Sequence, residues 1–101
     1  MTNLPIACTL DPAALKARRA GLLATLLQRA VGRHETADGC RLQFDAAPDV
    51  LEAVARTVDA ERRCCRFLRF QITVEPDEGA IVLDLTGPPG SREFLAALLD
   101  P

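Results

Sequence analysis

Hydrophobic and polar residues recur along this chain with two different periods, and each period predicts a different element. A helical period runs from Asp11 to Val31, where Asp11-Pro12 supplies a cap followed by a first-turn proline. The apolar positions on this predicted helix are Leu15, Leu22, Leu23, Leu26, Leu27 and Ala30. Ahead of it, residues 6–10 form a short apolar piece that fits either an edge strand or a lead-in, and length alone does not decide between them.

A second helical period opens at Pro48 and reaches about Cys65. Its predicted apolar face carries Val50, Leu51, Val54, Val58 and Cys65. Between the two helices, residues 33–39 are polar and end in the turn signal Asp38-Gly39. Residues 40–44 then alternate between apolar and polar, so we predict a loop followed by a half-buried strand.

The remaining pattern predicts a β-hairpin and a final helix. Residues 68–74 and 81–85 alternate on either side of Pro76-Asp77-Glu78-Gly79, which indicates two strands with one apolar face. Gly87-Pro88-Pro89-Gly90 ends the second strand, and Ser91 is a suitable cap for a short helix. That helix would bury Phe94, Leu95, Leu98 and Leu99. The whole order predicts an α+β fold, a two-layer sandwich of a small, mainly antiparallel sheet and about three helices.

Length and composition bound the organisation of the chain. Its 101 residues fit one domain, 1–101, and this size suffices to bury one core. Hydrophobic residues make up 49% and charged residues 26%, which is typical of globular proteins. The sheet has few strands, and exposed edges would leave room for a homodimer that pairs or covers one of them.

Charge and hydropathy exclude two classes of partner. A formal net charge of -2 lacks the excess of Lys and Arg that general nucleic-acid binding requires. No apolar stretch approaches the ~20 residues of a membrane span, and residues 1–3 lack the start of a secretory signal. We therefore expect no membrane partner and a cytoplasmic location. In that compartment the four cysteines are expected to be reduced thiols.

One constellation carries candidate chemistry, and it lies at the end of the second predicted helix. Projected at about 100° per residue, Glu61 falls inside the apolar stripe, where a carboxylate needs a cation, a metal, a hydrogen-bond donor or local access to water. Cys64 follows it by three residues and Cys65 by four, so both can approach that carboxylate. If the helix ends irregularly here, two soft sulfurs and one oxygen could face one ligand.

Two electrostatic effects act on these thiols in opposite directions. Four arginines surround the pair and favour thiolate, the form that binds soft metals and attacks electrophiles: Arg62, Arg63, Arg66 and Arg69. The carboxyl end of a helix disfavours an anion at Cys65. Sequence alone does not tell which effect is larger.

A structural interpretation stands beside the chemical one. Cys65 could be a small core residue, with Glu61 paired to Arg41 or Arg69 at the sheet edge. Cys40 and Cys8 fit packing better than ligation, although Cys8 keeps a claim because a lead-in segment can fold over a helix end. The one histidine, His34, is expected to be solvated in a polar loop.

The segment Glu61-Arg62-Arg63-Cys64-Cys65-Arg66-Phe67-Leu68-Arg69-Phe70 resembles a family of small uncharacterised bacterial proteins with an ERxCCxFxxF motif. Cys8-Thr9-Leu10 upstream and Leu85-Thr86-Gly87-Pro88 downstream extend the resemblance over most of the chain. The family's association with mercury-type metal resistance implies soft-metal handling, with Cys8, Cys64 and Cys65 as candidate ligands. This chain has Arg66 where proline is common in the family, which puts the geometry of the helix end in doubt.

Three hypotheses follow. The leading one is binding of a soft metal ion, such as mercury, zinc, copper(I) or an arsenical, through Cys64 and Cys65 with Cys8 or Glu61 assisting. The second is a thiol-dependent redox enzyme or sensor in which Glu61 accepts a proton. The third is a structural, dimeric interaction module with packed cysteines. No organic cofactor is expected, and whether the protein is an enzyme stays open.

Overall fold

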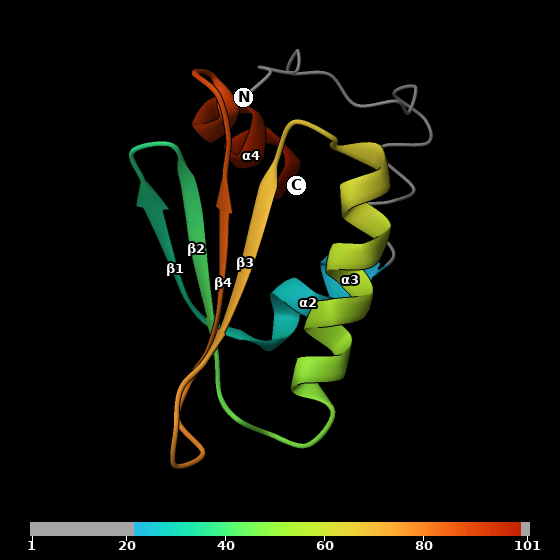
Figure 1. The fold of residues 1–101 in the computed structure, drawn as a ribbon, viewed down its shortest axis with the longest axis vertical. Helices are drawn as coiled ribbons and strands as arrows, with labels where there is room; N and C mark the ends of the chain where they lie inside the picture. The colour runs from blue at the N-terminus through green and yellow to red at the C-terminus, as the bar shows by residue number, and fades with distance from the viewer. Residues whose placement is uncertain (1–21, 100–101) are drawn as a thin grey trace.

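The computed structural model describes residues 22–99, which form an α+β fold of three helices and four strands (Figure 1). The elements in chain order are α2 (Leu22–Arg29), β1 (Ala30–Thr36), β2 (Gly39–Phe44), α3 (Val50–Cys64), β3 (Arg69–Val74), β4 (Ile81–Thr86) and α4 (Ser91–Leu99). The predicted fold class is confirmed. The predicted lead-in at residues 6–10 and the first half of the first predicted helix lie outside the described residues.

The four strands form one antiparallel sheet in the order β1-β2-β4-β3. Two hairpins, β1-β2 and β3-β4, meet where β2 pairs with β4, and α3 connects them along the chain. The predicted hairpin of β3 and β4 is confirmed, with Phe70 opposite Leu85 and Val74 opposite Ile81. Because directly opposed residues share a face, the apolar side chains of both strands point to the same layer.

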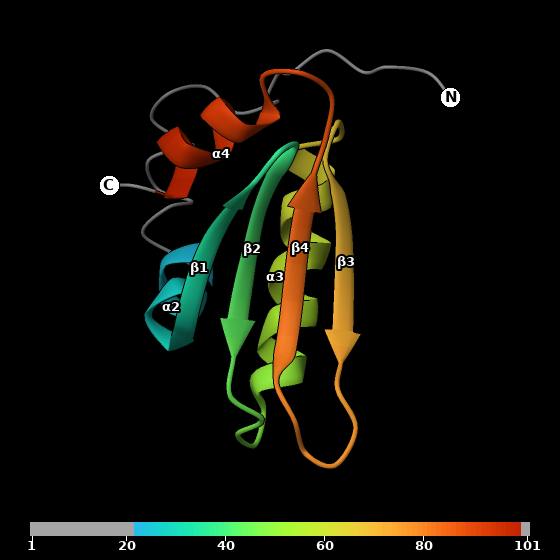
Figure 2. The same ribbon diagram turned by 90° about the vertical axis from the view of Figure 1, so that its left-hand side faces the viewer.

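The helices cover one face of the sheet and enclose the core (Figure 2). In this view α3 lies behind the central strands, α2 lies behind β1, and α4 crosses the upper end. The main core consists of Leu26, Cys40, Leu42, Phe44, Val50, Val54, Ile81, Leu83, Leu85, Leu95 and Leu99. Within the described residues, no helix has both the length and the apolar character that a membrane span requires.

The buried stripe of α3 differs from its predicted face. Its members follow one another at alternating steps of four and three residues: Val50, Val54, Thr57, Glu61 and Cys64. The predicted members Leu51 and Val58 are exposed and half-buried, respectively. Thr57 takes the inner position because its hydroxyl donates a hydrogen bond of 2.9 Å to the Ala53 carbonyl, which satisfies the buried polar group.

Of residues 33–39, predicted as a loop, 33–36 belong to a strand, whereas 37–38 form the predicted turn. The first helix ends at Arg29, and β1 begins at Ala30 and continues to Thr36. Apolar alternation is missing from β1 because it is an edge strand whose inward positions carry charges, Arg33 opposite Leu42 and Glu35 opposite Cys40.

Ser91 does not act as the predicted side-chain cap. It is the first residue of α4, and its buried hydroxyl donates to the Pro88 carbonyl at 2.7 Å instead of accepting from a helix N–H. The hydroxyl therefore fixes the turn that precedes the helix. The predicted burial of Leu95 and Leu99 is confirmed.

Candidate functional site

The candidate site lies where α3 ends and the chain turns toward β3. Cys64 is the last helical residue, and Cys65 leaves the helix with φ -107° and ψ 73°. The Cys65 N–H still donates to the Glu61 carbonyl at 2.7 Å, and the Leu68 N–H donates to the Cys65 carbonyl at 3.1 Å. These two hydrogen bonds hold the vicinal cysteines at the irregular helix end that the sequence suggested.

Glu61 and both cysteines are buried together. Their exposed fractions are 5% for Glu61, 4% for Cys64 and 0% for Cys65. The expectation that Glu61 lies in the buried stripe is therefore confirmed. Cys64 follows Glu61 on that stripe, whereas Cys65 is buried by the change in backbone direction at the helix end.

A small cluster of buried residues surrounds the cysteine pair, and Leu68 and Phe94 connect it to the main core because they pack against both. Cys64, Cys65 and Phe67 form a cluster of buried residues, against which Leu68 and Phe94 pack. The rings of Phe67 and Phe94 meet edge to face, with centroids 5.0 Å apart and planes at 79°. Phe94 belongs to α4, so the final helix closes a site built at the end of α3. The sequence pattern marked Phe94 as a core residue but gave no sign that it packs here.

No family model, curated protein or solved structure matches the chain. The chemistry of the site therefore rests on its own residues.

One described cysteine differs from the expected reduced thiols, and two agree with that expectation. Cys64 is disulfide-bonded, while Cys40 and Cys65 are free cysteines. The fourth cysteine, Cys8, lies outside the described residues. A neutral disulfide sulfur is a much weaker metal donor than a thiolate, so a ligand role for Cys64 would require reduction.

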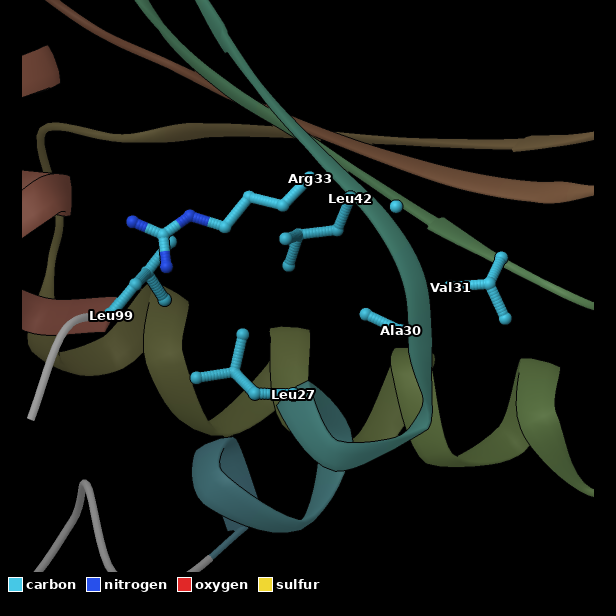
Figure 3. A pocket seen from close by; sticks show the side chains of 7 residues that line it. Leu27, Ala30, Val31, Arg33, Leu42 and Leu99 are labelled. Carbon is cyan, nitrogen blue, oxygen red and sulfur yellow. The ribbon is translucent and has the colours of Figure 1, made fainter.

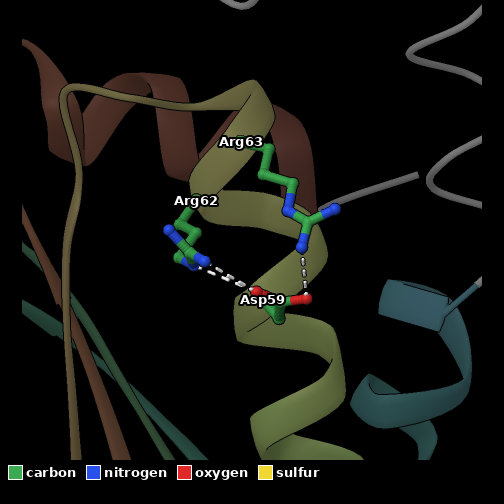
Figure 4. Close-up of polar contacts among 3 residues, drawn as sticks. All are labelled: Asp59, Arg62 and Arg63. Carbon is green, nitrogen blue, oxygen red and sulfur yellow. Dashed lines mark hydrogen bonds and ion pairs between the residues drawn. The ribbon is translucent and has the colours of Figure 1, made fainter.

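Two of the four arginines beside the pair, Arg62 and Arg63, are paired with Asp59 on α3. Asp59 accepts from Arg62 Nε at 3.1 Å and from Arg63 Nη2 at 3.0 Å, and all three side chains are largely exposed (Figure 4). The i,i+3 and i,i+4 spacing from Asp59 was the sequence signal for these pairs. Since one carboxylate faces both guanidinium groups, their charge favours a thiolate less than the sequence suggested.

One proposed partner of Glu61 has a different contact. Arg41 pairs with Asp84, with its Nε 2.8 Å from Oδ1, across the β2-β4 register. Arg69 and Glu61 both take part in an interaction, so the pairing of Glu61 with Arg69 stays a prediction. The interpretation in which Arg41 neutralises Glu61 is therefore wrong.

Cys40 and His34 lie elsewhere in the fold. Cys40 belongs to the main core, as predicted for a packing residue, and burial raises the pKa of its thiol to about 11 against the opposing effect of Arg33. His34 is exposed as predicted, although on β1 and not in a loop.

The described residues offer few side chains that could ligate a metal ion at the candidate site. Within residues 22–99, no cluster of three or more His, Cys, Asp or Glu side chains is arranged to hold a metal ion. Glu61, Cys64 and Cys65 supply the right donor types, but two soft sulfurs become available only in the reduced state. A complete site needs a further donor or a small rearrangement at the helix end.

A separate pocket lies between α2, β1, β2 and the end of α4 (Figure 3). Its volume is about 260 Å³, and it is lined by Leu27, Ala30, Val31, Gly32, Arg33, Leu42 and Leu99. The sulfur cluster contributes no lining residue, so this pocket is not part of the candidate site.

Proposed function

We propose that the protein, in its reduced state, binds a soft metal ion through the thiolates of Cys64 and Cys65. One observation supports the proposal: a carboxylate, Glu61, is buried beside two vicinal cysteines at the irregular end of a helix. Thiolates prefer mercury, zinc, copper(I) and arsenicals, and exclusion of water strengthens charged contacts within such a site. Glu61 is the proposed oxygen donor, and Cys8 stays the predicted third sulfur.

Binding of this kind depends on redox state. Two equivalents of an external thiol reduce the Cys64 disulfide to the Cys64 thiol and its partner thiol, and deprotonation of Cys64 and Cys65 then gives the two proposed ligands. The oxidised protein then lacks one ligand and is expected to bind weakly. This difference separates a specific site from general adhesion of metal ions to surface carboxylates.

Differential alkylation tests the proposal at the level of single residues. The reduced protein is mixed with mercuric or zinc ions alone, then treated with N-ethylmaleimide, and each cysteine is quantified by mass spectrometry. Alkylation of Cys64 and Cys65 is expected to slow on metal addition, and Cys40 in the main core is the internal control whose rate stays constant. Equal rates for Cys64 and Cys65 with and without metal would contradict the proposal.

A thiol-disulfide role is the second candidate, and the disulfide at Cys64 is the observation that favours it. In this role two molecules of a small thiol such as glutathione reduce the disulfide and are released as one small-molecule disulfide, leaving two protein thiols. Equilibration in glutathione redox buffers distinguishes the candidates. A midpoint within the physiological glutathione range favours a sensor, whereas a much lower midpoint indicates a structural bond.

A further inference from the structure

The two edges of the sheet are built differently. The β1 edge carries charged residues on its inward face, Arg33 and Glu35, and a register shift between Ala30 and Gly32. Inward charges and bulges are the usual protection of an edge against another strand. The β3 edge has an unbroken register and bears Ile72 and Val74, which are 37% and 55% exposed.

The outer edge of β3 presents backbone N–H and carbonyl groups that no strand within residues 22–99 pairs with. The Glu75 N–H donates to the carbonyl of its directly opposed residue, Ala80, at 3.1 Å. Because hydrogen-bonded and non-hydrogen-bonded pairs alternate along an antiparallel ladder, this bond shows which residues of β3 direct their backbone groups toward β4. By alternation, Phe70, Ile72 and Val74 direct their N–H and carbonyl groups away from β4. Within residues 22–99 no strand pairs with this edge, which lies at the right of the sheet in Figure 2.

We propose that the β3 edge binds the β3 edge of a second copy of this chain, in antiparallel orientation with Ile72 opposite Ile72 on the two-fold axis. This register also sets Phe70 opposite Val74 of the other copy. It is the symmetric register that uses the outward groups of all three residues. The two sheets then join into one continuous sheet.

When two β3 strands pair with Ile72 opposite Ile72, the side chains of one copy face complementary side chains of the other. The same register places Arg69 opposite Glu75 of the second copy and Gln71 opposite Thr73, on the face away from the helices. Opposite charges and hydrogen-bonding pairs directly across an antiparallel ladder are favourable. Arg69 also has an interaction within its own chain, and its exposed guanidinium presents several donors. If the two β3 strands were shifted by two residues relative to each other, Arg69 would no longer lie opposite Glu75.

Sedimentation velocity of the full reduced chain tests the dimer from micromolar to near-millimolar concentration. The wild type is expected to reach twice the monomer mass of 10.9 kDa, and Ile72→Lys is expected to stay monomeric while its circular dichroism is unchanged. Val31→Lys, an exposed aliphatic residue on the opposite edge, is the matched control and keeps the dimer.

An Ile72→Cys variant tests the register independently. Opposed residues of a hydrogen-bonded antiparallel pair have Cα atoms about 5.5 Å apart, within disulfide range. Oxidation is expected to give a 72-to-72 linkage by peptide mapping, and Thr73→Cys gives far less of its own linkage. A wild type that stays monomeric, with the edge taken by its own N-terminal segment or left open, would overturn the proposal, as would a dimer that survives Ile72→Lys.

Discussion

The N–H of Cys65 donates a hydrogen bond of 2.7 Å to the carbonyl of Glu61, which ties the cysteine pair to the buried carboxylate of α3. The side chain of Glu61 is 5% exposed and takes part in an interaction. Backbone and side chain of one residue therefore both contribute to the site. Replacement of Glu61 is therefore expected to lower stability and, if the proposed metal site exists, metal affinity as well.

Replacement of Glu61 by alanine is expected to lower the free energy of unfolding by about 1 to 3 kcal/mol, because it removes a buried polar group and leaves its partner unsatisfied. Glu61→Gln keeps the shape and loses less. Urea unfolding under reducing conditions measures both. Glu52→Ala is the control: its carboxylate pairs with Arg56 at 2.6 Å on the exposed face of the same helix, and such pairs contribute about 0.3 to 0.5 kcal/mol. Equal losses at both positions would contradict the assignment.

Gly39 lies against the neighbouring strand so closely that a side chain has no room. A Cβ at this position would collide with the Leu85 carbonyl oxygen and lie 2.8 Å from the carbonyl carbon. Gly39→Ala is therefore expected to separate β2 from β4 and destabilise the fold by more than about 2 kcal/mol. In Gly32→Ala, by contrast, the nearest atom lies at 3.6 Å, so a near-neutral effect is predicted. Thermal unfolding of both variants tests the difference, and similar midpoints would refute it.

The raised pKa of Cys40 predicts a loss of stability in alkali. The folded protein keeps the thiol proton up to about pH 11, whereas the unfolded chain releases it near the ordinary pKa of 9.0. The stability that the neutral thiol contributes is therefore full below pH 9 and is lost as the pH rises toward 11, by up to about 1.4 kcal/mol per pH unit. Urea unfolding between pH 8 and 10 should show a decline for the wild type relative to Cys40→Ala. A constant difference between the two would count against it.

The turn between β3 and β4 stores backbone strain at two residues. Asp77 and Glu78 have φ values of 60° and 56°, and the Gly79 N–H closes the turn on the Pro76 carbonyl at 3.1 Å. Glycine adopts this left-handed conformation without strain, so Glu78→Gly is expected to stabilise the protein by about 1 kcal/mol. Glu52→Gly in α3 is the control and should destabilise by a similar amount. A loss of stability in Glu78→Gly would show that the turn is not strained.

Elements with a strong period were predictable, and elements shaped by tertiary contacts were not. The β3-β4 hairpin and most of α3 follow directly from alternation and helical spacing. The strand β1 was missed because Arg33 and Glu35 occupy its inward positions, where the pattern requires apolar residues. In α3 the inner position of Thr57 depends on the Ala53 carbonyl, which a hydropathy pattern does not represent.

The candidate site was predictable in part. Burial of Glu61 beside the cysteine pair followed from its place in the apolar stripe. The disulfide at Cys64 was not predicted, because the cytoplasmic location expected from the sequence implied reduced thiols. The cover that Phe94 provides depends on the path of α4 across the end of the sheet, which a linear pattern does not specify.

The measurement that tests the central claim most directly is a titration of the reduced protein with mercuric or zinc ions, followed by thiolate-to-metal absorbance. We predict saturable binding that disappears in Cys64→Ser/Cys65→Ser and persists in Cys40→Ala, whose thiol lies in the main core. Stoichiometric binding that survives in the double variant, or wild-type affinity no greater than that of a free thiol, would contradict a metal site at this pair.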